Sequence, residues 1–385
     1  MYDYKIVNGL VFDSLQGVFK QNNLYIKDSI VEEISDIDHE SKSVIDAQDK
    51  FVCPGFVDEH LHLDYQGSLI GVNGDTVCIP NGVTTACDGG TCGVSNFPLF
   101  YRSNIIRYEA DTYAYLNVST FGNKSLCIHE EDHDPLDFRF DLIEKCFEKY
   151  GDVIRGLKVR MCQGTLGDSL GLAPLLATLE ISEKLKQKGY RCPIVVHYDN
   201  LPANVKVDDL FGALRKDDII AHVFQNKRET IFDSDGRIKN SVISARNRGV
   251  IMDDCHGRVH WTIKHLKNAF KQEFFPDIIS SDAVRISEYV RPGFSLLYAL
   301  NMDIACGMSF ERALQAVTIN PAKALGLDKV GKIFEGGIAD VTIIEKMKIK
   351  TSLFDNCGDS IAVENLVTPL LTMKSGRVAF RQLYF

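Results

Sequence analysis

The chain of 385 residues contains no apolar stretch long enough to cross a bilayer and no long cluster of lysine or arginine. The first absence argues against a membrane-spanning protein, because a spanning helix needs about 20 apolar residues. The second, together with a net charge of -9, argues against a surface for nucleic acid or anionic membranes. The first residues also lack the basic start and apolar segment of a signal peptide. We therefore expect a cytoplasmic protein whose partner is a small-molecule substrate.

Paired cysteines are absent as well. None of the 11 cysteines forms a C-x-x-C motif, and several, such as Cys53, Cys87 and Cys255, lie within apolar runs that are typical of strands. This pattern predicts free, buried thiols of a reducing compartment rather than a disulfide framework. A phosphate-binding loop is missing too, since the glycine-rich segment 163–171 lacks the Lys-Ser/Thr ending of that motif.

What the chain does contain is ample material for a core, with 45% hydrophobic and 25% charged residues. Its length favours one large domain and a smaller one. Between residues 51 and 282, strand-like apolar runs alternate with amphipathic segments such as 137–151 and 172–190. The eight runs are 51–63, 82–90, 112–120, 153–161, 193–198, 218–224, 249–255 and 277–282. Eight strands with intervening helices predict a (β/α)8 TIM barrel.

The two ends of the chain have a different pattern. Residues 1–50 carry short alternating strands with turn residues between them, and the last 55 residues resume this pattern, with strands interrupted by glycine. We predict that both termini meet in one small β-sandwich beside the barrel. The predicted domains are therefore residues 1–53 plus 331–385 for the sandwich and 54–330 for the barrel.

Two histidines stand near the end of the first run, in PGFVDEHLHLD. Side chains two apart on a strand point the same way, so His60 and His62 could bind one cation, although two ordinary histidines would give the same pattern. Lys158 lies between the apolar Leu157 and Val159 of the fourth run, where an unpaired ammonium would be costly. A structural ion pair would compensate for this cost. So would a deprotonated amine that carries CO2 as a carbamate and bridges two metals.

The remaining candidates also end apolar runs. His197 follows PIVV and His222 follows DIIA, on the fifth and sixth runs. Asp282 closes the eighth run, where a carboxylate could bind a metal and exchange protons with a reacting water. Taken singly, each could be a core histidine or a turn residue. Because the carboxyl ends of barrel strands meet at one rim, the six residues together favour a two-metal site.

These residues and three motifs resemble the amidohydrolase superfamily. PGFVDEHLH resembles the opening motif of the family, GLKVRM the strand that carries a carbamylated lysine, and NPAKALGL with KIFEGGIADVTII the closing segment. The resemblance is strongest to the binuclear, lysine-bridged branch. This branch includes dihydroorotases, hydantoinases and a dihydroorotase-like or deacetylase-like group.

The resemblance implies a hydroxide held between two divalent ions, most often zinc. The ligands it implies are His60, His62 and Asp282 for one ion, His197 and His222 for the other, and carbamylated Lys158 as the bridge. Asp282 would also take the proton of the nucleophile and pass it to the leaving group.

One position departs from the dihydroorotase pattern, which has an arginine two residues beyond the second histidine to hold the substrate carboxylate. Here that residue is Asp64, which cannot replace a guanidinium. Arg160, on the same strand face as Lys158, is the predicted substitute, with a structural salt bridge as the alternative. The other predicted substrate-binding residues are Asn117, His256, Gly257 and Arg285.

The leading hypothesis is a metal-dependent hydrolase of an amide or acetyl ester of a small, carboxylate-bearing compound. The alternatives are a cyclic amidase of the dihydroorotase or hydantoinase type and a nucleobase deaminase of the adenine type. A non-catalytic scaffold is a third hypothesis, against which the retention of all six ligands argues. Barrels of this kind commonly form homo-oligomers, but the sequence does not determine the number of subunits.

Overall fold

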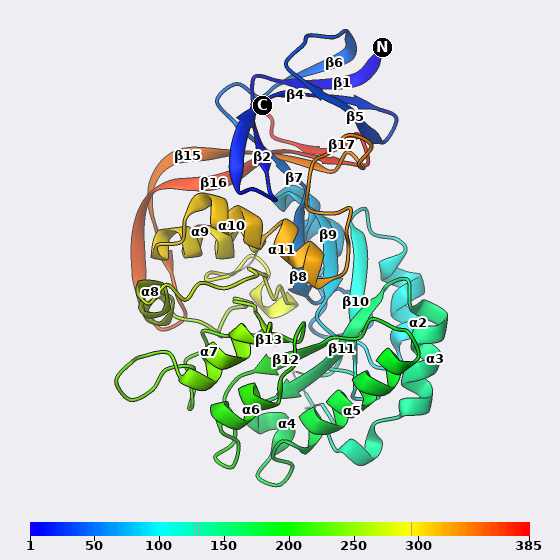
Figure 1. Ribbon diagram of the computed structural model, residues 1–385, viewed down its shortest axis with the longest axis vertical. Coiled ribbons are helices and arrows are strands. Elements are labelled where there is room, and N and C mark those ends of the chain that lie inside the picture. Colours follow the sequence, from blue (N-terminus) through cyan, green and yellow to red (C-terminus); the bar gives the residue numbers. More distant parts are fainter. Residues whose placement is uncertain (127, 130, 294) are drawn as a thin grey trace.

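The computed structural model describes residues 1–126, 128–129, 131–293 and 295–385. At its centre is a curled parallel sheet whose neighbouring strands follow one another in the sequence (Figure 1). Its seven strands are β8 (Phe56–Leu61), β9 (Val83–Asp88), β10 (Asp111–Asn117), β11 (Ile154–Met161), β12 (Ile194–Tyr198), β13 (Ile219–Ala221) and β14 (Ile251–Met252). Most residues of these strands are buried, which explains why they form continuous apolar runs rather than alternating patterns.

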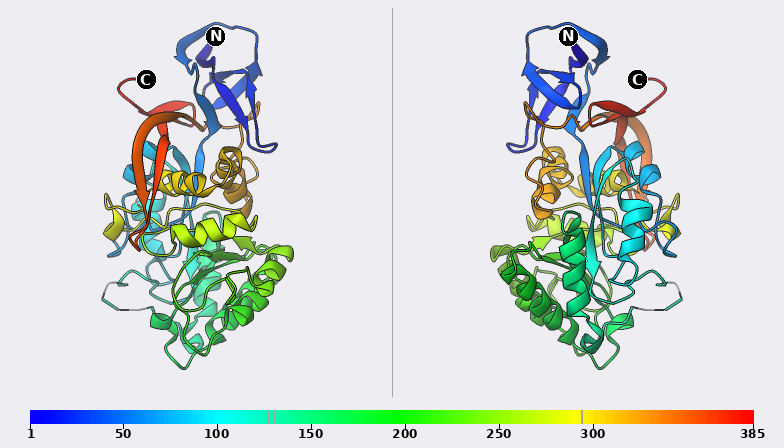
Figure 2. Two further views of the ribbon diagram at one scale, coloured as in Figure 1. Left: turned by 90° about the vertical axis from the view of Figure 1, so that its left-hand side faces the viewer. Right: turned by 90° about the vertical axis from the view of Figure 1, so that its right-hand side faces the viewer.

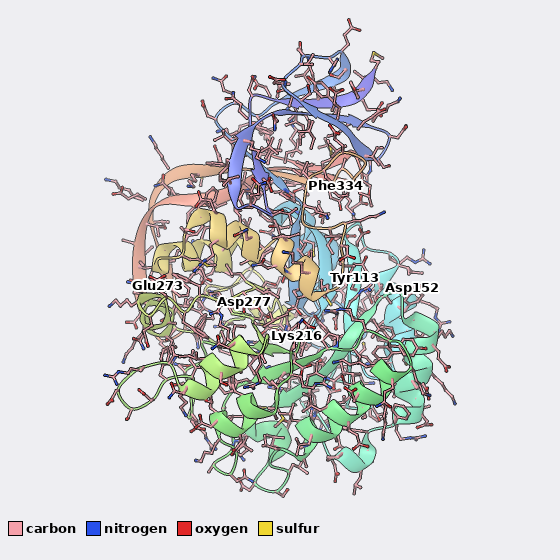
Figure 3. The ribbon with its side chains drawn as sticks, viewed as in Figure 1. Tyr113, Asp152, Lys216, Glu273, Asp277 and Phe334 are labelled. Atoms are coloured by element: carbon pink, nitrogen blue, oxygen red, sulfur yellow. The ribbon has the colours of Figure 1, made fainter. Side chains whose placement is uncertain are left out.

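The eighth predicted run, residues 277–282, closes this sheet without forming a regular strand. An isolated parallel bridge joins it to the segment that follows β14, and on its other side the Asp282 amide donates to the His60 carbonyl at 2.7 Å. At the start of the run, Asp277, labelled in Figure 3, accepts a hydrogen bond from the Arg246 guanidinium at 2.8 Å. The predicted (β/α)8 barrel is therefore confirmed, with an irregular last strand.

The first predicted run, residues 51–63, is divided between two sheets. Strand β7 (Phe51–Pro54) pairs with terminal strands, and β8 begins directly after Gly55. A Cβ atom on Gly55 would lie 2.1 Å from the hydroxyl oxygen of Thr84 on β9, so only glycine lets the chain pass this close. The chain changes sheets at this glycine, a step that the apolar pattern alone did not reveal.

Helices occupy the connections between successive barrel strands, and three more, α9 to α11, follow the eighth run (Figure 1). They are α1 (Gly74–Val77), α2 (Phe97–Phe100), α3 (Phe140–Tyr150), α4 (Gln163–Leu166), α5 (Ala173–Gln187), α6 (Val207–Ala213), α7 (Asn240–Asn247), α8 (Ile263–Lys271), α9 (Leu296–Cys306), α10 (Phe310–Ala316) and α11 (Ile319–Ala324). The predicted helical segments 137–151 and 172–190 correspond to α3 and α5. Among the described residues, no helix has both the length and the apolar character that a bilayer crossing requires.

The chain ends form two further sheets, one of N-terminal strands and one that combines both ends, above the barrel in Figures 1 and 2. One has the order β5 (Ile30–Ser35), β4 (Asn23–Lys27), β1 (Tyr2–Val7), β6 (Ser41–Asp46), and the other β17 (Arg377–Arg381), β16 (Ser360–Lys374), β15 (Val341–Phe354), β7, β2 (Leu10–Asp13), β3 (Val18–Gln21). Buried residues of both ends, such as Ile6, Leu24 and Val341, form one hydrophobic cluster. The predicted sandwich is confirmed, and the domain limits at 53/54 and 330/331 remain a proposal.

Strands β15 and β16 form a long antiparallel hairpin that leaves the sandwich and runs along α9 (Figure 1). Near its far end, the hydroxyl group of Tyr298 on α9 donates to the Phe354 carbonyl at 2.7 Å and accepts the Phe354 amide at 2.9 Å. The hairpin thus fastens the terminal sheets to the helical layer of the barrel.

Candidate metal centre

The six predicted ligands lie at the carboxyl ends of the barrel strands, where βα barrels hold their reactive groups. They are His60 of β8 and His62 just after it, Lys158 of β11, His197 of β12, His222 just after β13, and Asp282 at the end of the eighth run. None is more than 7% exposed. Several of them line a single cavity of about 330 Å³. The sequence therefore located a set of side chains that the fold brings together.

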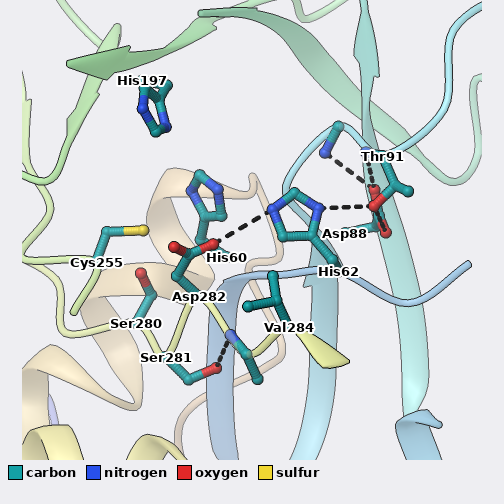
Figure 4. Close-up of polar contacts among 12 residues, drawn as sticks. His60, His62, Asp88, Thr91, His197, Cys255, Ser280, Ser281, Asp282 and Val284 are labelled. Carbon is teal, nitrogen blue, oxygen red and sulfur yellow. Dashed lines mark hydrogen bonds and ion pairs between the residues drawn. The ribbon is translucent and has the colours of Figure 1, made fainter. Parts of the chain in front are cut away.

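His60, His62 and Asp282 form the first ligand group, with one donor atom of each within 4.8 Å of the others. His62 Nε2 lies 3.3 Å from Asp282 Oδ1 (Figure 4). On the opposite side of the ring, His62 Nδ1 lies 2.7 Å from Thr91 Oγ1, whose own hydrogen is donated to Asp88 Oδ2 at 2.7 Å. Thr91 must therefore accept from His62 Nδ1, which leaves Nε2 directed at the Asp282 carboxylate. A hydrogen bond of this kind, on the ring nitrogen that faces away from the centre, orients a metal-binding imidazole.

His197 and His222 form the second ligand group. His222 Nδ1 lies 2.7 Å from the Cys255 carbonyl, which can only accept, so Nδ1 carries the proton and Nε2 a lone pair. That lone pair faces His197 Nδ1 at 2.9 Å. His260 brings a third ring nitrogen within 4.8 Å of this pair. Two ring nitrogens this close either share one proton or bind one cation.

Lys158 lies beside the first ligand group, with its Nζ 2.9 Å from His60 Nε2. Within the described part of the chain, no carboxylate approaches Lys158 Nζ within 4.0 Å, so the structural ion pair considered from the sequence is not formed there. Burial lowers the pKa of Lys158 below its ordinary value. A neutral amine is the form that can react with CO2.

The electrostatics of the site favour cation binding. Burial is the largest cause that lowers the pKa values of His60, His197 and His222 well below the ordinary value, so these imidazoles are neutral. Neutral imidazole is the form that binds metals. Burial alone would raise the pKa of Asp282, but the hydrogen bond from His62 and the neighbouring histidines hold it well below its usual range, so this group is a carboxylate.

Two buried ring nitrogens, His60 Nδ1 and His197 Nε2, have no hydrogen-bond partner among the described residues. Buried polar atoms are usually paired, so these two unpaired ring nitrogens indicate that a further group binds in the centre. Neutral imidazoles, one carboxylate and a buried lysine form a donor set suited to divalent first-row metals. The residues present therefore fit a metal centre.

Glycines after β9 provide the room for this arrangement. A Cβ atom on Gly89 would lie 2.2 Å from His60 Cδ2, and one on Gly90 would lie 2.5 Å from Lys158 Cβ. Gly90 also has a φ of +93°, which residues with a side chain rarely adopt. Any larger residue at these positions would displace a predicted ligand.

The structure places one of the predicted substrate-binding residues, Arg160, in the cavity wall. Asn117 points its amide to the Gly90 carbonyl at 2.9 Å and to Glu131 at 3.0 Å. Gly257 lies against the metal centre instead, since a Cβ atom there would be 2.6 Å from Asp282 Oδ2.

The other two predicted substrate-binding residues lie outside the cavity lining. His256 Nε2 is 2.7 Å from Asp254 Oδ2 and 3.1 Å from Asp303 Oδ1, and its ring lies on Trp261. The guanidinium of Arg285 binds the carbonyls of Tyr65 and Gly71. Their assignment as substrate contacts remains a prediction. Asp64, where dihydroorotases have arginine, is buried and accepts the Cys92 thiol at 3.4 Å.

Comparisons with known proteins find relatives of the chain. A model of the Amidohydrolase family matches residues 239–379. A deacetylase of Enterococcus faecalis is 25% identical over 85% of this chain and 86% of its own, and a deacetylase of Agrobacterium fabrum is 28% identical over 84% and 78%. In sequence, the chain is therefore similar to amidohydrolases.

Solved structures of amidohydrolases share the fold. An adenine deaminase aligns with a TM-score of 0.89 at 24% identity, covering 99% of this chain and 100% of the other. A dihydroorotase aligns with a TM-score of 0.88 at 24% identity and 98% coverage of each chain. The family match and the relatives indicate a metal-dependent hydrolase that acts on small molecules.

The cavity also contains polar residues that were not among the predicted ligands or substrate contacts. They are Asn123, Glu131 and His260, and Arg258 of the loop after β14 lines the cavity as well. His260 Nδ1 lies 3.4 Å from Asp199 Oδ2, and the Arg258 Nε atom is buried without a hydrogen-bond partner among the described residues. Arg258 and His260 follow β14 in the same loop as His256. Sequence alone indicated the loop but not which of its side chains turns inward.

Proposed function

We propose that this amidohydrolase is deacetylase-like and cleaves an amide or acetyl ester of a small, carboxylate-bearing compound. The observation that carries the proposal is the cavity, which has the metal ligands on one side and two arginines, Arg160 and Arg258, in its wall. A guanidinium fork binds a carboxylate with two parallel hydrogen bonds. Because Arg258 Nε is buried and unpaired among the described residues, a substrate anion would satisfy it.

The centre would hold two divalent ions, with zinc as the first candidate. The first ligand group would bind one ion, the second ligand group the other, and Lys158, as a carbamate, would link them. When bound, the ions would lower the pKa of a water molecule and polarise the scissile carbonyl.

The side chains around the centre would then transfer the proton and exclude water. Asp282, held as a carboxylate, would accept the proton of the attacking water and deliver it to the leaving amine or alcohol. Apolar residues complete the cavity and would exclude other water from the acyl group. These are Ile70, Leu126, Val259, Val284 and Ile286.

A substrate screen tests the proposal. The compounds are N-acetyl amino acids, acetylated hydroxy acids, dihydroorotate, hydantoins and adenine. Higher kcat/KM for the acetylated acids supports deacetylation. Higher kcat/KM for adenine or for the cyclic amides would assign the protein to one of the alternatives, and no turnover with metal-loaded protein would favour the scaffold.

Substitution of the two arginines in the cavity wall tests the proposed substrate carboxylate directly. Arg258→Met should raise KM for an acetylated acid by about tenfold or more while kcat changes less, because the lost contact is made in ground and transition states alike. Arg160→Met is the companion variant and Arg102→Met, at an exposed position, the matched control. Equal KM values for Arg258→Met and Arg102→Met would contradict the proposal that the substrate has a carboxylate bound by Arg258.

A further inference from the structure

Glu131 lies in the wall of the cavity that contains the predicted metal ligands, on the connection between β10 and β11. It is only 5% exposed, and it lines the cavity together with Lys158 and Arg160 of β11. The proton transfer assigned to Asp282 does not involve this carboxylate. A buried carboxylate at a substrate cavity needs a partner, because an unpaired buried charge is costly.

The protein fixes one oxygen of this carboxylate. Asn117 at the end of β10 donates one amide hydrogen to Glu131 Oε1 at 3.0 Å and the other to the Gly90 carbonyl at 2.9 Å. The side-chain oxygen of Asn117 accepts from the Ser119 amide at 2.9 Å. Asn117 thus orients Glu131 and has no amide hydrogen left for a substrate.

The second oxygen of Glu131, Oε2, has no hydrogen-bond partner among the described residues. His133 Nδ1 lies 3.9 Å from it, too far for a hydrogen bond. Burial lowers the pKa of His133, and its Nε2 accepts the Arg160 amide at 2.9 Å, so this ring is neutral at neutral pH and does not balance the charge. Within the described part of the chain, no lysine or arginine forms an ion pair with Glu131. Lys158, as the proposed carbamate, would itself be negatively charged.

A second acceptor lies on the same connection. Asn123 is 6% exposed and lines the cavity, and its Oδ1 also lacks a hydrogen-bond partner among the described residues. The connection between β10 and β11 therefore contributes two unpaired acceptors, whereas Arg258 after β14 contributes an unpaired donor. Because buried polar atoms are usually paired, the cavity suits a ligand that carries hydrogen-bond donors as well as an anion.

We propose that Glu131 binds an ammonium group of the substrate, which is then an acylated amino acid with both a free amine and a carboxylate. This inference rests on the proposed deacetylase-like function. An ammonium has a full positive charge and three donors, so it can pair with Glu131 Oε2 and has hydrogens left for further acceptors of the cavity. A hydroxyl group would satisfy the oxygen without balancing its charge. A metal ion does not fit this position, since Glu131 belongs to none of the groups of potential metal ligands found among the described residues.

The pairing predicts which acetylated acids the protein accepts. A compound without the ammonium leaves Glu131 buried and unpaired, and loss of one member of a buried charge pair weakens binding about 30-fold or more. The carboxylate proposed to bind Arg258 is common to all of these acids. The ammonium is therefore the group that distinguishes them.

Two pairs of compounds isolate this group. Nε-acetyl-lysine has an α-ammonium that 6-acetamidohexanoate lacks, and Nα-acetyl-lysine has a side-chain ammonium that Nα-acetylnorleucine lacks. In at least one pair, the wild type should cleave the ammonium-bearing compound with about 30-fold or higher kcat/KM. The difference should lie mainly in KM, because the contact is made in ground and transition states alike.

Three variants test whether Glu131 causes the preference. Glu131→Gln removes the charge but keeps the size of the side chain and an acceptor for Asn117. It should lower kcat/KM for the ammonium-bearing compound about 30-fold and leave that for its neutral counterpart unchanged. Glu131→Asp keeps the charge on a shorter side chain and should retain part of the preference. Glu148→Gln, at an exposed position on α3, is the matched control and should retain all of it.

The possible failures are distinct. Wild-type protein that cleaves both members of each pair equally well, or a preference that persists in Glu131→Gln, would overturn this inference and leave the proposed function intact. Wild-type protein that cleaves none of these acetylated acids, nor the others in the substrate screen, would overturn both.

Discussion

Thr91 holds the tautomer of His62, and its replacement by valine tests whether that hydrogen bond supports metal binding. Valine has nearly the same shape but cannot accept from His62 Nδ1. The change also removes the hydrogen bond that Asp88 Oδ2 receives from the hydroxyl, but this oxygen keeps the Leu63 amide at 2.7 Å. The main interaction lost is therefore the hydrogen bond of His62 Nδ1.

The magnitude follows from the two states of the ring. Without metal, His62 can move its proton to Nε2 and donate to Asp282 Oδ1, 3.3 Å away, so the metal-free protein loses little. With metal on Nε2, the proton must remain on Nδ1, which is then buried without a partner. That penalty is about 2 kcal/mol, which corresponds to a roughly 30-fold weaker metal affinity.

Competition with a chromogenic chelator measures this affinity. Thr85→Val is the matched control, because Thr85 is also buried on β9 and its hydroxyl has no hydrogen-bond partner among the described residues. The control should bind metal as wild type does. Unchanged affinity in Thr91→Val, or an equal loss in Thr85→Val, would refute this reasoning.

Two further predictions concern other parts of the site. Gly89→Ala should displace the His60 ring and lower kcat/KM by about 100-fold. Gly212→Ala is the control, because Gly212 lies on α6 with open space around it, and this variant should keep full activity. Similar activities of the two variants would contradict the steric argument. Burial would lower the pKa of His256, but the carboxylates of Asp254 and Asp303 raise it to about 9. A raised pKa stabilises the fold fully below about pH 6.5, and this stabilisation is lost as pH rises through about 9. In urea unfolding, the free energy of unfolding of the wild type should therefore fall by about 3 kcal/mol relative to that of His256→Gln over this range. Parallel pH profiles of the two proteins would exclude the effect.

The fold was predictable because parallel barrel strands are buried on both faces. Val195 and Val196 before His197, or Ile219 and Ile220 before His222, form apolar runs that end at a polar residue. That local pattern is enough to place the residue at the rim. The sheet change at Gly55 was not predictable, since it depends on contact with Thr84 on another strand.

The details of the site depend on contacts between distant segments. His62 meets Thr91 29 residues away, and His256 meets Asp303 47 residues away. Nothing near His256 in the sequence reveals that an aspartate of α9 binds it, so only its rim position was predictable. The inward turn of Arg258 likewise depends on the tertiary path of the loop after β14.

Metal analysis of the purified protein tests the central claim most directly. After growth with zinc and exhaustive dialysis, elemental mass spectrometry should find about two ions per chain in the wild type and clearly fewer in Lys158→Ala, because the bridge is lost. Trace metal in the wild type, or an unchanged content in Lys158→Ala, would contradict the two-metal, lysine-bridged centre.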